Sequence, residues 1–271
     1  MLDAHTITPT TFKEKLRNYS AIFTSISPPR VSSTAFARVF WEHPDIRYYC
    51  HEPFEVNYYE GKSLDAVADM INDPLDLHAV DPEHHSAEGQ ALFIKEMVYQ
   101  LGDHFPILAH FAVKPIIFLI RNPRLNVSSR IHKKEETGDS RFFPYVETGW
   151  ELMQARIADC KQHHIPYLLV DASDFRNHPE KIFPQVFEAL GLGFSKEMLT
   201  WQSYHHVDLD NLEGAHTHLY KRVLGSKGIQ PANEPIPELD FFPEEQGFRA
   251  HVEVCMDIYE RLLQDSNRVL I

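Results

Sequence analysis

The stretch that decides the fold runs from Ser20 to Val39 and reads SAIFTSISPPRVSSTAFARV. It begins with an apolar run, Ala21 to Ile26, that has the length and composition of a buried strand. Two prolines end this strand, because a proline has no backbone N–H for the hydrogen bonds of a sheet. A short polar loop, Arg30 to Thr34, follows, and apolar residues then recur at helical spacing. The stretch therefore predicts a strand, a tight loop and the first turns of a helix.

The loop between this strand and helix has the features of an anion-binding site. The first turn of a helix has unpaired backbone N–H groups, and the helix dipole makes that end positive. The Arg30 side chain adds a forked cation suited to a phosphate or sulfate group. The alternative is that Ser33 and Thr34 only cap the helix, as serine and threonine often do. The loop has no glycine and no Walker A sequence, so it does not support ordinary ATP or GTP hydrolysis.

The composition is that of a globular protein. The chain has 271 residues, 43% of them hydrophobic, and we expect one domain over 1–271. Its net charge of −13 disfavours nucleic acid and anionic membranes as partners. Three cysteines that lie far apart in the sequence indicate reduced thiols in the cytoplasm rather than a disulfide framework. No signal peptide is evident and no apolar run approaches about 20 residues, so we expect no membrane span.

Strands and helices alternate along the chain. This order predicts an α/β fold with a mainly parallel central sheet flanked by helices, in which ligands bind at the carboxyl ends of the strands. The clearest strand is Lys114–Ile120, an apolar run typical of a strand buried on both faces. We expect three additions to this α/β fold: helical insertions at about 55–90, a flap at 135–149, and a C-terminal segment at 203–271 that wraps over the sheet. The other predicted strands are 45–50, 91–97 and 165–170, and the other predicted helices are about 123–134, 150–163, 179–190 and 248–263.

A second basic motif follows the strand Lys114–Ile120. Arg121 leaves the carboxyl end of that strand, where a buried cation needs an anion or an acid beside it. Ser129 comes eight residues later, about two turns into the next predicted helix, and can approach the same ligand. The alternative is an arginine paired with a carboxylate and a serine that is there by chance.

These motifs together resemble a known family. Pro-Arg-x-Ser-Ser-Thr from Pro29, followed by Arg-Asn-Pro-Arg-x-x-x-x-Ser from Arg121, looks like the two nucleotide motifs of the sulfotransferases that use 3′-phosphoadenosine 5′-phosphosulfate (PAPS). A later strand with an acidic turn, Tyr167–Phe175, and the helix that ends before Gly191 are similar to the same family. The resemblance covers roughly residues 20–192, with weak similarity from 55 to 90.

The resemblance implies a role for each matching residue. The 5′-phosphosulfate of PAPS would lie against the first motif, and the 3′-phosphate against Arg121 and Ser129. A late basic loop would close over the 3′-phosphate. Many soluble members have lysine where this chain has Arg30, and the usual glycine of the first motif is absent. The predicted residues of the first motif are Arg30, Val31, Ser32, Ser33 and Thr34, and those of the late loop are Arg222, Lys227 and Gly228.

Sulfuryl transfer also requires a base that takes the proton of the acceptor. Glu52 is the first candidate, because it follows the second strand and because Glu52-Pro53 resembles the Glu-Pro of carbohydrate-type sulfotransferases, where that glutamate is the base. Cytosolic members have a histidine at the end of the next strand, but that position falls near Met97 here. Arg30 and Lys95 complete the predicted catalytic set, with Lys95 able to stabilise the bridging oxygen. Glu52 could instead be a solvated loop carboxylate or a helix cap, and the other candidates for the base are Glu96, Lys95 and His104.

The sequence thus predicts sulfuryl transfer from PAPS to a hydroxyl or amine of a small acceptor. The alternatives are an ATP-dependent small-molecule kinase on the same fold and a non-catalytic nucleotide-binding protein. A set of aromatic residues could line a pocket for the acceptor, which would suit an alcohol, a phenol or a lipid-like molecule. The alternative is that these residues only pack in the core or in the flap. The residues of this set are Phe54, Tyr58, Tyr59, Phe142, Phe143 and Tyr145.

We expect no metal ion. The 17 histidines include adjacent pairs, such as His84-His85, His163-His164 and His205-His206, and neighbours in sequence point in different directions. His216 and His218 are two residues apart, and no His-Glu-x-x-His or Cys-x-x-Cys motif is present. The histidines are therefore predicted to lie in solvated loops.

Overall fold

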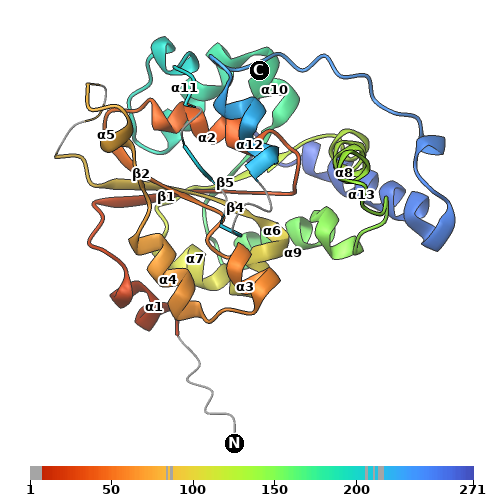
Figure 1. The fold of residues 1–271 in the computed structure, drawn as a ribbon, viewed down its shortest axis with the longest axis horizontal. Helices are drawn as coiled ribbons and strands as arrows, with labels where there is room; N and C mark the ends of the chain where they lie inside the picture. Colours follow the sequence, from red (N-terminus) through yellow and green to blue (C-terminus); the bar gives the residue numbers. More distant parts are fainter. Residues whose placement is uncertain (1–7, 84, 86–87, 205–206, 210, 213–216) are drawn as a thin grey trace, which may run out of the picture.

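The protein is built around one six-stranded sheet that has helices on both faces (Figure 1). The computed structural model describes residues 8–83, 85, 88–204, 207–209, 211–212 and 217–271. The strand order is β3-β2-β4-β1-β5-β6, and every pair is parallel except β2 with β3. The predicted α/β fold class is confirmed. The strands are β1 (Ala21–Ser27), β2 (Ile46–His51), β3 (Leu75–Asp76), β4 (Ala91–Met97), β5 (Ile116–Ile120) and β6 (Tyr167–Asp171).

Alternate side chains of the strands point into two separate hydrophobic cores, one on each face of the sheet. Ile22 and Leu92 point to one face of the sheet, whereas their neighbours Phe23 and Phe93 point to the other. The first face is covered by α1 (Pro9–Lys15), α3 (Glu55–Glu60), α4 (Leu64–Asn72), α6 (Val98–Leu101), α7 (Phe105–Phe111), α9 (Trp150–Gln162) and α13 (Phe248–Leu263). The second face is covered by α2 (Ser33–Trp41), α5 (Leu77–Val80), α10 (Ala172–Asn177), α11 (Pro179–Ala189) and α12 (Thr217–Leu224).

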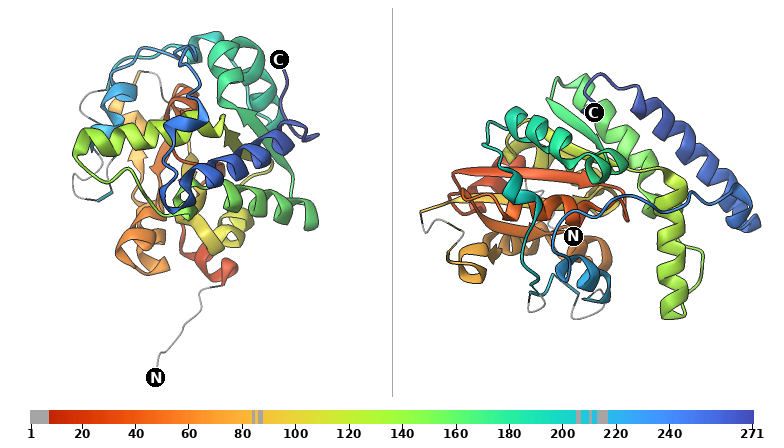
Figure 2. Two further views of the ribbon diagram at one scale, coloured as in Figure 1. Left: turned by 90° about the vertical axis from the view of Figure 1, so that its right-hand side faces the viewer. Right: turned by 90° about the horizontal axis from the view of Figure 1, so that it is seen from above.

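A third, smaller core joins two helices at one end of the sheet. Val127 and Ile131 of α8 (Pro123–Thr137) pack with Phe248 and Val252 of α13. Figure 2 shows these two helices side by side, beyond the carboxyl ends of the strands. This arrangement places one face of α8 over the region where the sequence predicts a ligand.

Most predicted elements appear close to their expected bounds. The strand 91–97 matches β4, and all five side chains of β5 are fully buried, as the apolar run indicated. The region 55–90 contains the predicted helices, together with β3, a two-residue antiparallel strand that the sequence did not predict. The helix α8 is three residues longer than expected and ends where Gly138 adopts a left-handed φ of 77°. None of the helices that the structure describes is long and apolar enough to cross a membrane.

The glycine at the start of α9 packs tightly against the residues that lead into the first loop. Gly149 has a φ of +81°, and an added Cβ would lie 2.9 Å from Val98 Cγ1 and 3.1 Å from Pro28 Cα. We expect Gly149→Ala to lower the free energy of unfolding by about 2–4 kcal/mol, because it combines backbone strain with a clash. Gly138→Ala is the control, since Gly138 has a similar φ of +77° but nothing within 4 Å, and it should cost about 1–2 kcal/mol. Urea denaturation measures both; equal losses would contradict this account of Gly149.

Candidate active site

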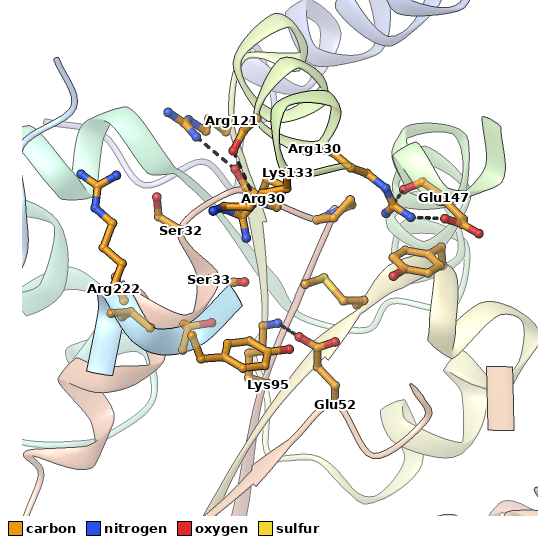
Figure 3. Close-up of a pocket in the computed structure, with 18 of the residues that line it drawn as sticks. Arg30, Ser32, Ser33, Glu52, Lys95, Arg121, Arg130, Lys133, Glu147 and Arg222 are labelled. Carbon is orange, nitrogen blue, oxygen red and sulfur yellow. Dashed lines mark hydrogen bonds and ion pairs between the residues drawn. The ribbon is translucent and has the colours of Figure 1, made fainter. Parts of the chain in front are cut away.

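A cavity of about 970 Å³ opens at the carboxyl ends of the parallel strands (Figure 3). Residues that follow β1, β2, β4 and β5 line it, as the crossover rule for parallel sheets predicts. The structure therefore brings together motifs that are far apart in the sequence. The predicted residues that line this cavity are Arg30, Ser32, Ser33, Thr34, Glu52, Lys95, Arg121, Ser129, Arg222 and Gly228.

The first loop presents an uncapped helix terminus to the cavity. Arg30 and Ser32 both have left-handed backbone conformations, with φ values of 60° and 62°, so the loop turns tightly without a glycine. Ser32 is the N-cap residue of α2, and its side chain makes no capping hydrogen bond. Ser33 and Thr34 lie within the first helical turn and do not cap it. The backbone N–H groups of that turn are thus available to an anion.

The second motif supports the first directly. Asn126 of α8 donates a hydrogen bond from Nδ2 to the carbonyl of Pro29, at 3.1 Å. Arg121 donates from Nη1 to the carbonyl of Arg30, at 3.1 Å, and Arg30 donates from Nε to Ser129 Oγ, at 3.3 Å. Figure 3 shows the Arg30 and Arg121 side chains next to each other at one wall of the cavity. The two predicted anion sites are therefore parts of one structure.

Arg121 lies at the end of β5 and is only 6% exposed. Its Nη2 is 3.3 Å from Glu234 Oε2, and Arg176 Nη1 is 3.0 Å from Glu234 Oε1. Burial lowers the pKa of Arg121, and the Glu234 carboxylate opposes that shift. Arg121 thus meets a carboxylate, as one of the two sequence-based interpretations expects, and it also lines the cavity, so its binding of an anionic ligand stays a prediction.

Glu52 is buried against the cavity, and each of its two carboxylate oxygens accepts a hydrogen bond. Its side chain accepts a hydrogen bond from Lys95 Nζ at Oε1 and one from Gln100 Nε2 at Oε2, the latter at 3.0 Å. His51 Nε2 lies 3.2 Å from the same Oε1. Burial raises the pKa of Glu52, but Lys95 and His51 lower it by more, so the carboxyl group is ionised well below its ordinary range. At 2% exposure Glu52 is not a solvated loop residue.

Two other candidates for the base lie elsewhere. The Glu96 carboxylate accepts hydrogen bonds from the backbone N–H groups of Phe54, at 2.9 Å, and Met97, at 2.6 Å, and it does not line the cavity. Burial, together with the charge of Glu52, raises its pKa. His104 stacks on Phe54 and is also absent from the lining. Among the carboxylate and histidine candidates, the structure thus brings Glu52 alone to the cavity.

The comparisons with known proteins bear on the whole of this site. The model of the sulfotransferase domain family matches residues 22–245, which include every cavity residue described above. The chain belongs to the sulfotransferase domain family. The resemblance seen in the sequence is therefore confirmed. No curated protein matches this sulfotransferase.

Three solved structures are similar to this sulfotransferase in fold. A sulfotransferase domain from the curacin biosynthetic pathway is 17% identical, with 92% of this chain and 99% of that chain covered and a TM-score of 0.49. A sulfotransferase domain from the Synechococcus PCC 7002 olefin synthase is 15% identical, with 90% and 96% covered and a TM-score of 0.49. Mouse sulfotransferase SULT7A1, complexed with PAP, is 11% identical, with 70% and 65% covered and a TM-score of 0.40.

The cavity of this sulfotransferase is more basic than the sequence motifs indicate. Eight lysine and arginine side chains and five carboxylates line it, although the whole chain has a net charge of −13. Several of these cations come from one face of α8, where basic residues recur at helical spacing after Ser129. The helical spacing could have been used to predict the cations of α8 from the sequence. No sequence motif marks Arg176 or Tyr220. The lining residues that sequence reasoning missed include Gln100, Arg130, Lys133, Lys134, Arg176, Tyr220 and Glu234.

Some residues that the sequence predicts for the site do not have side chains that line the cavity. The Val31 side chain is fully buried in the hydrophobic core, so only its backbone could meet a ligand. Lys227 is exposed and does not line the cavity, whereas its neighbour Gly228 does. Of the six aromatic residues proposed for the acceptor, Tyr59, Phe142 and Phe143 line the cavity. Phe54 is fully buried in the core, and Tyr58 and Tyr145 are not among the lining residues.

No metal centre is found in the part of the chain that the structure describes. His163 and His164 lie on the surface near the end of α9, as predicted, but His85 is 6% exposed, so the prediction of a solvated histidine is wrong for His85. The predicted solvated histidines His84, His205, His206 and His216 lie outside the described residues, and so does the side chain of His218.

Proposed function

We propose that the protein transfers a sulfuryl group from PAPS to a hydroxyl or amine of a small acceptor. One observation carries this proposal: two anion-binding loops, around Arg30 and Arg121, meet in a single basic cavity beside a buried carboxylate. The family supplies sulfuryl transfer as the reaction. The donor and the class of acceptor are our inference from the residues that line the cavity.

In this proposal each end of the donor has its own set of residues. The backbone N–H groups at the start of α2 and the Arg30 side chain hold the 5′-phosphosulfate. Arg121 and Ser129 hold the 3′-phosphate. Arg222 and Gly228 of the late basic loop also line the cavity, whereas Lys227 does not. The aromatic side chains Tyr59, Phe142 and Phe143 line the part of the cavity left for an alcohol, a phenol or a lipid-like acceptor.

The reaction exchanges one bond to sulfur for another. The acceptor oxygen attacks the sulfuryl sulfur, the bond from sulfur to the bridging oxygen of the donor breaks, and adenosine 3′,5′-bisphosphate (PAP) leaves. Glu52 takes the proton of the acceptor, and Lys95 and Arg30 stabilise the negative charge that develops on the bridging oxygen. Before the reaction, the hydrogen bond from Lys95 keeps the Glu52 carboxyl group ionised. Only as the bond to the bridging oxygen breaks does Lys95 turn to that oxygen, so that the pKa of Glu52 rises and the carboxylate becomes a better base at the moment of proton transfer.

Turnover with labelled PAPS tests this function. The protein is incubated with PAPS labelled in the sulfuryl group and a panel of alcohols, phenols and amines, and parallel samples contain labelled ATP with magnesium. Label transferred from PAPS supports the proposal. Transfer from ATP would favour a kinase, and binding of PAP with neither transfer nor slow hydrolysis of PAPS would favour a non-catalytic protein.

The pH dependence of turnover distinguishes a glutamate base from a histidine base. Because the pKa of Glu52 lies below its ordinary range, the carboxylate stays ionised from neutral pH down to at least about pH 5. We therefore expect kcat/KM for the acceptor, at saturating PAPS, to show no acid limb near about pH 6.5, where an ordinary histidine titrates. An acid limb at that pH would mean that another group takes the proton.

The proposal includes a cytoplasmic location. Cys50, Cys160 and Cys255 are all buried and free, as suits a reducing compartment. Reaction of the purified protein with a thiol reagent, with and without denaturant, would count these thiols directly.

A further inference from the structure

The segment that connects α12 to α13 carries a short strap, residues 228–238, past the cavity. Arg176 of α10 holds this strap by donating from Nε to the carbonyl of Gln230, at 2.9 Å, and from Nη2 to the carbonyl of Pro231, at 2.6 Å. Asn177 Oδ1 accepts a hydrogen bond from the backbone N–H of Ala232, at 2.9 Å. Figure 1 shows the connection running from α12 along the side of α10 before it reaches α13. The strap is thus anchored at the end of α10.

The strap places one carboxylate among the cations of the cavity. Both oxygens of Glu234 accept hydrogen bonds from Arg176 Nη1, at 3.0 and 3.1 Å, and Oε2 is 3.3 Å from Arg121 Nη2. Arg121 and Glu234 both line the cavity. Burial raises the pKa of Glu234, but the two arginines and a backbone hydrogen bond lower it by more, so this carboxylate is ionised at neutral pH.

Glu234 and the donor therefore compete for the same cation. Under the proposed function, Arg121 is the main ligand of the 3′-phosphate, yet one of its terminal nitrogens already faces a carboxylate. Two anions at one guanidinium repel each other. Arg121 is only 6% exposed, but the Glu234 side chain is 40% exposed, so solvent screens part of this repulsion. We propose that Glu234 is a resident anion of the 3′-phosphate subsite, which the phosphate must displace from Arg121, so that Glu234 tunes the affinity for 3′-phosphorylated nucleotides; this inference rests on the proposed function.

The exchange has a simple structural form. Arg176 keeps Glu234 by two hydrogen bonds, whereas Arg121 meets only one of its oxygens. The carboxylate can therefore leave Arg121 while it remains on Arg176 and the strap stays in place. A phosphate dianion carries more charge and more acceptor oxygens than a carboxylate, so it can replace Glu234 at Arg121. A nucleotide that lacks the 3′-phosphate leaves the Arg121–Glu234 pair intact.

Calorimetry with two nucleotides tests this proposal. Dissociation constants are measured for PAP and for AMP, which lacks the 3′-phosphate, on the wild-type protein, Glu234→Gln and Glu238→Gln. Glu238 lies on the same strap but pairs with Arg124, outside the cavity lining, so it is the matched control. We expect Glu234→Gln to bind PAP about tenfold more tightly than the wild type, with AMP affinity unchanged. Glu238→Gln should leave both affinities unchanged.

The outcomes separate this inference from the proposed function. Wild-type protein that binds PAP no more tightly than AMP would contradict the 3′-phosphate site and hence the proposed donor. Wild-type protein that prefers PAP, together with a Glu234→Gln variant whose PAP affinity is unchanged, would overturn only the role of Glu234. Weaker binding of both nucleotides by Glu234→Gln would also overturn it, because the carboxylate would then serve only to hold the strap.

Discussion

Replacing Glu52 with glutamine lowers kcat about 100- to 1,000-fold and leaves the dissociation constant of PAP within about twofold of the wild type, the range expected for loss of a general base. The amide keeps the shape of the side chain but cannot take a proton. Glu52 is the one acidic candidate for the base that lines the cavity, and Lys95 and Gln100 fix its orientation. Turnover with the acceptor that reacts, together with calorimetry for PAP, measures the two effects. An unchanged kcat would show that Glu52 is not the base.

The variant needs a control for charge and one for folding. Glu55→Gln is the matched control for charge, because Glu55 is buried in the same cavity and also accepts a hydrogen bond from Gln100 Nε2, at 3.5 Å. It should lose less than about tenfold in kcat, since the proposed mechanism gives Glu55 no proton to transfer. Glu52→Gln also leaves the buried charge of Lys95 without its carboxylate, which costs about 3–5 kcal/mol of stability. Assays must therefore run well below its melting temperature, and retained PAP binding shows that the variant is folded.

Replacing Arg121 with methionine weakens PAP binding about 100-fold, because truncation of one member of a buried charge pair typically costs 2–5 kcal/mol. Methionine fills a similar volume but cannot bind a phosphate. The effect should depend on the 3′-phosphate, so AMP binding should weaken by less than about threefold. Calorimetry with both nucleotides measures this difference.

Arg121 also supports the first loop, so the experiment must distinguish a direct role at the 3′-phosphate from an indirect role through that loop. Its hydrogen bond to the carbonyl of Arg30 helps to hold the loop that would bind the 5′-phosphate. If Arg121→Met weakened AMP and PAP by the same factor, the residue would act through the loop, and the assignment of the 3′-phosphate would be wrong. Arg124→Met is the control, because Arg124 lies three residues further along the chain and does not line the cavity. It should change neither affinity.

The sequence allowed most of the sheet to be predicted, because β1 and β5 are short apolar runs next to prolines and because the other long strands alternate with helical patterns. The run at Ile116–Ile120 is fully buried, and parallel strands bring their carboxyl ends to one edge, so Arg30, Glu52 and Arg121 were expected to meet. Among the strands that the structure describes, only β3 was not predicted, because two residues are too few to show a periodicity.

The finer structure of the site could not be predicted, because it depends on contacts between distant segments. Glu234 is 58 residues from Arg176, and the intervening chain has little periodicity to show that they meet. The left-handed conformations of Arg30 and Ser32 also leave no trace in the sequence, since glycine is the residue that normally indicates them. The ion pair between Lys95 and Glu52 depends on the register of β2 and β4, which places His51 opposite Lys95.

A crystal structure of the protein with PAP tests the central claim most directly. The account predicts the 5′-phosphate at the N-terminus of α2, within hydrogen-bond distance of the backbone N–H groups of Ser33 and Thr34, and the 3′-phosphate on Arg121 and Ser129. Glu52 and Lys95 should then lie beside the open end of the 5′-phosphate. A nucleotide bound outside this cavity, or one whose two phosphates occupy the opposite loops, would contradict the account.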